Sequence, residues 1–167
     1  MGETIEQWHG CYDDSWKGFI VEEAFAHPAK FSRGLIARIL KHMLAEGMIH
    51  RGGTVVDPFG GIGTGGIVAA SHGLRWFGCE LEEKFVTLAK SNFDLHLMTW
   101  AGFADQLPVI VQGDSRKLRQ KLAGVLADSV VSSPPFLDAR SDTTPSIKGA
   151  TAPTRHDPEA WSQARRS

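Results

Sequence analysis

A glycine-rich stretch between two short apolar segments constrains the fold of this chain more than any other feature. Residues 54–80 read TVVDPFGGIGTGGIVAASHGLRWFGCE. The β-branched side chains of Val55 and Val56 predict a buried parallel strand. Asp57-Pro58 ends that strand, because proline cannot donate a hydrogen bond to a strand ladder. The glycines that follow allow the backbone to turn tightly and to approach a ligand closely.

A helix and a second strand are predicted after the turn. Residues 67–70 form the helix, Gly73 stops it, and residues 75–79 form the strand, with Glu80 at its carboxyl end. Strand, glycine turn, helix and strand in this order predict an α/β fold with a mostly parallel sheet and flanking helices.

Asp57 and Glu80 both fall at the carboxyl ends of strands, which is where open α/β sheets bind ligands. Gly61, Gly63 and Gly66 match the pattern G-x-G-x-x-G, which also fits a dinucleotide fold. A carboxylate at Asp57 would repel a pyrophosphate by about 4 kcal/mol for each close pair of charges. A cationic ligand reverses that sign, and S-adenosylmethionine carries a sulfonium, an ammonium and a ribose whose hydroxyls suit Glu80. The alternative is that Asp57 only caps the following turn and Glu80 the following helix.

Two amphipathic helices are predicted on either side of this stretch. The first begins at His27-Pro28, since proline is favoured in a first helical turn, and its apolar face covers residues 31–44. Its basic side chains are interpreted as a solvated surface. The second covers about 82–97, with Asn92 among its polar positions, and a loop follows over 98–106.

Residues 109–111 predict a third strand and residues 127–131 a fourth. Asp114 follows the third strand, where it could accept a hydrogen bond from an adenine amino group or serve as a helix cap. Ser115 is predicted to cap a helix over residues 116–122.

The fourth strand ends in Ser133-Pro134-Pro135-Phe136. Prolines lack an N–H group, so backbone carbonyls there stay free as acceptors, together with the Ser133 hydroxyl. An exocyclic amino group of a nucleobase would donate to both, with the base flipped out of its duplex and stacked on Phe136. The lone pair of the nitrogen then faces a methyl donor, so that positioning supplies much of the rate. The alternative is that Ser-Pro-Pro only ends the strand.

In their order along the chain, these motifs resemble those of the S-adenosylmethionine-dependent DNA amino-methyltransferases, which modify cytosine N4 or adenine N6. Asp57–Thr64 is similar to the cofactor loop, Gly78–Leu81 to the ribose-binding strand end, and Gly113–Ser115 to the adenine contact. Ser133–Phe136 resembles the catalytic [DNS]-P-P-[YFW] motif, and His27–Phe31 the motif ahead of the cofactor strand.

The resemblance implies a Rossmann-like methyltransferase fold, S-adenosylmethionine as cofactor and DNA as partner, as in restriction–modification. The residues that it assigns to cofactor binding are Asp57, Phe59, Gly61, Gly63, Thr64, Glu80, Asp114, His27 and Lys30. For the last two, a helix start and a surface role are alternatives. The residues that it assigns to catalysis and to the target base are Ser133, Pro134, Pro135 and Phe136. Serine at the first catalytic position favours cytosine N4 over adenine N6, for which aspartate is usual.

Size and composition agree with one domain. The chain has 167 residues, a net charge of −1 and 42% hydrophobic residues, enough for a core and without an overall basic field. Cys11 and Cys79 match no metal or redox spacing, and no apolar run spans a membrane, so we expect a cytoplasmic protein without a metal. The expected organisation is an N-terminal arm over 1–26, the methyltransferase domain over 27–137 and a polar tail or loop over 138–167.

The resemblance stops at the catalytic turn, after which family members continue through further strands and a sequence-reading region. A fourth strand left as a bare edge invites pairing with another chain. The fold is therefore expected to be incomplete at its C-terminal end, as a truncated product, a degenerate copy or part of a split enzyme that a second polypeptide completes. Three functions stay open: a DNA methyltransferase, a non-catalytic S-adenosylmethionine-binding partner and a nucleotide-dependent oxidoreductase. RNA or a protein glutamine is an alternative acceptor.

Overall fold

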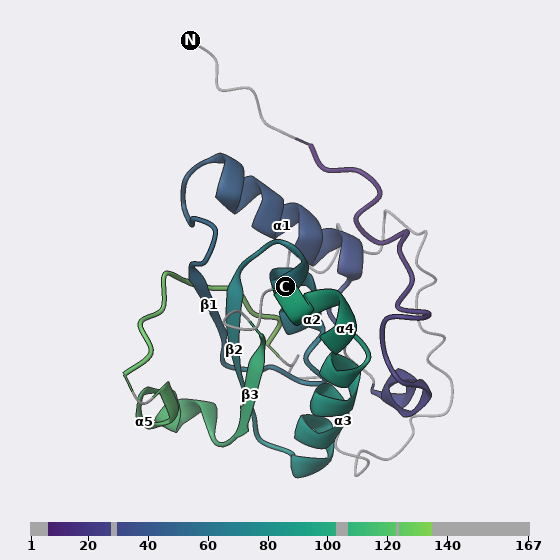
Figure 1. Ribbon diagram of the computed structural model, residues 1–167, viewed down its shortest axis with the longest axis vertical. Coiled ribbons are helices and arrows are strands. Elements are labelled where there is room, and N and C mark those ends of the chain that lie inside the picture. The colour runs from purple at the N-terminus through teal and green to yellow at the C-terminus, as the bar shows by residue number, and fades with distance from the viewer. Residues whose placement is uncertain (1–6, 28–29, 103–106, 123, 135–167) are drawn as a thin grey trace, which may run out of the picture. The chain divides into compact units, whose positions relative to one another are not determined.

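A parallel sheet carries the site in the computed structural model, which describes residues 7–27, 30–102, 107–122 and 124–134 (Figure 1). Its strands are β1 (Thr54–Asp57), β2 (Arg75–Glu80), β3 (Val109–Gln112) and β4 (Ser129–Val130). The sheet is four-stranded, with the spatial order β3-β2-β1-β4, and each neighbouring pair is parallel. All four carboxyl ends therefore meet at one edge. With the helices described next, this is a Rossmann-like α/β fold, as the sequence predicts.

Helices connect the strands on both faces of the sheet. α2 (Thr64–Ser71) joins β1 to β2, and α3 (Glu83–Asp94) with α4 (Leu97–Trp100) lies between β2 and β3. The 3₁₀ helix η3 (Ser115–Lys117) and α5 (Leu118–Leu122) lead from β3 back across the sheet to β4. Because crossovers are right-handed, α5 belongs to the face opposite α2 and α3, and Figure 1 shows α5 to the left of the strands and α2–α4 to their right. No helix in the described part of the chain is long and apolar enough to cross a membrane.

The helix predicted to begin at His27-Pro28 begins later. α1 spans Arg33–Ala45, whereas His27 ends the short 3₁₀ helix η1 (Glu22–Ala26). The ammonium of Lys30 donates to the carbonyls of Phe25 and His27, at 2.9 and 2.5 Å, and so links the segment just before α1 to the end of η1.

Several further boundaries differ from the prediction. α2 begins at Thr64 and not at residue 67, so that Gly65 and Gly66 belong to the helix, and β4 covers only Ser129–Val130 of the predicted 127–131. Residues 98–100, predicted as loop, belong to α4, because Trp100 is only 5% exposed and packs in the core. Residues 103–106 of the same predicted loop lie outside the described residues. Asp114, and not Ser115, caps η3, since its carboxylate accepts from the backbone N–H of Arg116 at 2.9 Å.

Asn92, predicted as a polar outer position of α3, is fully buried. Its Nδ2 donates to the carbonyl of Ile62 at 2.9 Å, and its Oδ1 accepts from the N–H of Val21 at 2.8 Å. One side chain therefore joins the N-terminal arm, α3 and the glycine turn.

The glycines make room for two aromatic side chains beneath the turn. A Cβ added at Gly78 would lie 2.1 Å from the Trp76 ring, and one at Gly63 would lie 2.6 Å from the Phe93 ring. Gly63 also has φ 77°, a conformation that favours glycine. The close approach expected toward a ligand is thus partly an approach toward the protein's own core.

Replacing Asn92 by alanine should lower the free energy of unfolding by about 2–4 kcal/mol, since the buried N–H of Val21 and carbonyl of Ile62 each lose a partner at about 1–3 kcal/mol. Urea denaturation at neutral pH measures this loss. Lys90→Ala, an exposed change on the same helix, should stay within about 0.5 kcal/mol of wild type. A loss for Asn92→Ala no larger than that of Lys90→Ala would contradict the bridging role.

Gly78→Ala should destabilise the fold by about 1–3 kcal/mol or more, because the added methyl group overlaps the Trp76 ring. Gly102→Ala is the matched control, since a Cβ there meets nothing within 4 Å. Thermal unfolding followed by circular dichroism compares the two variants. Equal melting temperatures would mean that the indole moves aside at little cost.

Candidate functional site

The carboxyl edge of the sheet brings together the acids and the proline turn that the sequence singles out. Asp57 ends β1, Glu80 ends β2, and Asp114 follows β3. Ser133 follows β4. Given the strand order, these four positions succeed one another along the edge as Asp114, Glu80, Asp57 and Ser133.

Asp57 is buried, with 4% of its surface exposed. Its Oδ1 accepts hydrogen bonds from the N–H of Phe59 at 3.0 Å and from the hydroxyl of Ser132 at 2.6 Å. Burial raises the pKa of Asp57 and the charge of Glu80 adds to this effect, whereas the bonds from Ser132 and Phe59 oppose it. Within the described residues no hydrogen bond reaches Oδ2, so this oxygen keeps its acceptor capacity.

Glu80 holds the glycine turn against the end of β2. Its Oε2 accepts from the N–H of Gly61, and its Oε1 accepts from the N–H of Glu82, both at 2.9 Å. The capping contacts that the sequence left open as an alternative are therefore present for Asp57 and Glu80. An ionised carboxylate offers about four lone-pair sites, so each acid can also accept hydrogen bonds from a ligand.

Asp114 is engaged by one neighbouring cation. The side chain of Arg116 forms a salt bridge to its Oδ2 at 2.6 Å. The hydrogen bonds from Arg116 lower the pKa of Asp114 to about 2. An adenine amino group could bind Asp114 only if Arg116 gave way, and the Arg116 side chain is 88% exposed.

His27 lies beside the glycine turn, whereas Lys30 is held by the arm. The His27 ring packs edge-on against Phe85, with the centroids 4.3 Å apart, and a Cβ added at Gly61 would lie 3.6 Å from it. The Lys30 ammonium is bound to backbone carbonyls of Phe25 and His27, and burial lowers its pKa. The contacts of Lys30 are thus with the end of η1.

The remaining predicted residues differ in exposure. Phe59 is 40% exposed, whereas Thr64 is buried as the first residue of α2. Ser133 and Pro134 are exposed. Pro135 and Phe136 lie outside the described residues, so their assignment stays a prediction.

Two residues of the site were missed by sequence reasoning. Ser132 binds Asp57, and the Trp76 ring fills the space under Gly60, Gly65 and Gly78. Ser132 could have been found, because a hydroxyl just beyond the end of a parallel strand lies at the polar edge of the sheet. Trp76 gives no such signal, since aromatic residues are common in strands and usually just pack in the core.

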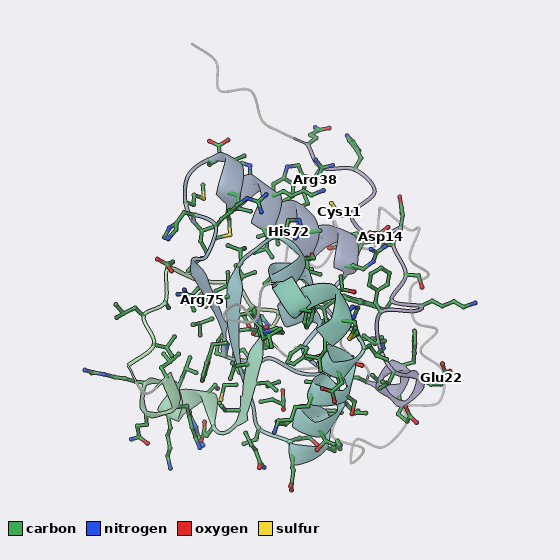
Figure 2. All side chains as sticks on the ribbon, viewed as in Figure 1. Cys11, Asp14, Glu22, Arg38, His72 and Arg75 are labelled. Atoms are coloured by element: carbon green, nitrogen blue, oxygen red, sulfur yellow. The ribbon has the colours of Figure 1, made fainter. Side chains whose placement is uncertain are left out.

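A separate hollow lies between the N-terminal arm and α1, and it is not part of this edge. Its volume is about 270 Å³, and Cys11, Asp14, Arg38 and Lys41 are among its lining residues. Figure 2 shows Cys11, Asp14 and Arg38 near α1, away from the lower ends of the strands. The basic residues of α1 therefore lie apart from the acids of the candidate site.

Comparisons with known proteins point to methyltransferases. A family model described as DNA methylase, of the N6/N4 type, matches residues 5–91, just over half of the chain. A solved S-adenosylmethionine-dependent methyltransferase from Agrobacterium tumefaciens is similar, with 22% identity and a TM-score of 0.44 over 60% of this chain. This chain spans 32% of the length of that protein.

A second similar structure is an RNA methyltransferase from Salinibacter ruber in complex with S-adenosyl-L-homocysteine. It has 23% identity and a TM-score of 0.35, over 56% of this chain and 69% of its own. No curated protein matches the sequence. On the match to the family model, with the strand-end acids and the glycine turn that it includes, this chain belongs to the N6/N4 DNA methylase family.

Proposed function

We propose that this chain transfers a methyl group from S-adenosylmethionine to an exocyclic amino group of a DNA base in the cytoplasm, with cytosine N4 as the preferred target. The observation that carries the proposal is the order of Asp114, Glu80, Asp57 and Ser133 along one edge of the sheet. The connections reverse direction between β1 and β4, and such a switch point is where open α/β sheets bind ligands.

The carboxylates at this edge fit the cofactor. S-adenosylmethionine is the methyl donor of the family, and it is elongated, with an adenine, a ribose and a cationic amino-acid part. Neighbouring strands are about 4.8 Å apart, so the edge from β3 to β4 offers a span of roughly 14 Å. Asp57 would bind the cationic part and Glu80 the ribose hydroxyls, both with unused lone pairs.

The proline turn supplies acceptors for the base. When bound, the cofactor supplies an electrophilic methyl group on its sulfonium. The hydroxyl of Ser133 and a carbonyl of the adjacent turn would accept the two hydrogens of the amino group and hold its lone pair toward the site. Both acceptors come from an exposed segment, which a flipped base can reach. Such a transfer needs no nucleophilic side chain, because positioning provides much of the rate.

The open edge of the sheet favours a second candidate, a subunit that binds the cofactor and becomes active only with another polypeptide. Val130 of β4 is 62% exposed, and β4 is the outer strand of the described sheet. Edge strands of this kind pair readily with a further chain. The candidates differ in one respect: the second predicts cofactor binding without methyl transfer by this chain alone.

Tritiated methyl transfer to unmethylated genomic DNA, followed by nucleoside analysis, tests the main proposal. We expect N4-methylcytosine; N6-methyladenine would change the target base, and cofactor binding without a product would favour the subunit. Ser133→Ala should reduce the transfer rate by about 100-fold while cofactor affinity changes little, because it removes one acceptor for the amino group. Unmethylated RNA and calorimetry with NAD serve as substrate and cofactor controls.

Asp57→Asn should separate stability from cofactor binding. The asparagine oxygen still accepts from Phe59 and Ser132, but it no longer attracts a cation, so affinity for S-adenosylmethionine should fall about 10–100-fold. Burial raises the pKa of Asp57 above its ordinary 3.8 in the folded protein. Wild type should therefore lose stability relative to Asp57→Asn as the pH rises from 3.8 to the raised pKa, with a constant difference above it.

Calorimetry and urea unfolding from about pH 4, close to the ordinary carboxylate pKa, to about pH 8 measure both effects. Asp94→Asn, an exposed change on α3, is the control and should alter neither property. Unchanged cofactor affinity in Asp57→Asn would refute the role given to its charge.

A further inference from the structure

The contact between Ser132 and Asp57 joins two parts of the proposed site. The two residues are 75 positions apart in sequence, and the hydroxyl of Ser132 donates to Asp57 Oδ1 at 2.6 Å. The same oxygen accepts the N–H of Phe59, the first part of the glycine turn. One oxygen atom therefore binds the start of the cofactor loop and the start of the proline turn.

Backbone pairing ends just before this point. The N–H of Val131 donates to the carbonyl of Val56 at 3.1 Å, and among the described residues no backbone hydrogen bond joins β1 to the segment after β4 beyond it. Beyond this bond the two segments separate. The segment after β1 leads to β2 on one side, whereas β4 is an outer strand of the described sheet. The Ser132 hydroxyl thus continues the connection between the two segments by one residue, from Val131–Val56 to Ser132–Asp57, directly before Ser133.

We propose that Ser132 is a positioning residue, which fixes Ser133 and Pro134 relative to the glycine turn by donating to Asp57. This inference rests on the proposed methyl transfer. The hydrogen of the Ser132 hydroxyl is donated to Asp57, and the proposal assigns the base amino group to the neighbouring Ser133. Its effect should appear in the chemical step, since reacting groups misplaced by about 1 Å lose roughly 100-fold in rate.

The test uses the full chain with three variants: Ser132→Ala, Ser132→Thr and Ser129→Ala. Ser129 lies in β4, three positions before Ser132, and its side chain makes no hydrogen bond with the described residues. Methyl transfer to unmethylated DNA gives kcat and KM, and calorimetry with S-adenosylhomocysteine gives the cofactor Kd.

Ser132→Ala should lower kcat by about 10–100-fold, with KM and the cofactor Kd changed less than about 3-fold. Ser132→Thr keeps the hydroxyl and should restore most of kcat, and Ser129→Ala should match wild type. If Ser132→Ala does not fold, Ser132→Cys replaces it: its weaker donor should give a lower kcat than threonine.

Three outcomes would overturn the inference. An unchanged kcat in Ser132→Ala, or in Ser132→Cys where that replaces it, removes the positioning role. Equal losses of kcat and cofactor affinity assign the hydroxyl to the cofactor loop alone. A folded Ser132→Thr as slow as Ser132→Ala shows that the hydroxyl is not the relevant group. Failure of the proposed function is recognised separately, since wild type would then transfer no methyl group to DNA, and the inference would fall with it.

Discussion

The buried carboxylate of Asp57 is the point on which the arrangement of the site depends. A charge removed from water is costly unless it is hydrogen-bonded, and here the N–H of Phe59 and the hydroxyl of Ser132 supply that stabilisation. Both donors belong to loops, so satisfying one carboxylate also fixes where two loops leave the sheet. Glu80 acts in the same way on the next strand through Gly61. Asp57 and Glu80 thus hold the loops in place, and on the proposed function they also bind the ligand.

Local sequence pattern was sufficient for the elements around the glycine turn. The valines of β1, the glycine after α2 and the strand that ends at Glu80 all follow from residues close in sequence. The parallel sheet then brings the strand-end acids to one edge without further information. Membership of the N6/N4 DNA methylase family agrees with the predicted strand, glycine turn, helix and strand, because the family model covers the glycine turn and both strands that flank it.

Two features that the sequence pattern did not reveal, the burial of Asn92 and the contact of Ser132, depend on residues far apart in the chain. Asn92 has the polarity of a surface position, and hydrogen bonds to Val21, 71 residues away, and to Ile62, 30 residues away, account for its burial. Ser132 shares this property, since its partner lies on another strand. Periodicity cannot report such pairs, because it records only which face of an element is apolar.

The bridge formed by Asn92 also bears on how a working fragment of this protein is delimited. Recognisable motifs surround the glycine turn, yet the hydrogen-bond partner of the turn's buried anchor is Val21, well ahead of the first strand. A fragment trimmed to the motifs would leave a polar amide stranded in the interior and the turn without its brace. The smallest unit able to keep the glycine turn in shape is therefore delimited by polar contacts inside the molecule, and it includes an upstream segment that carries no motif.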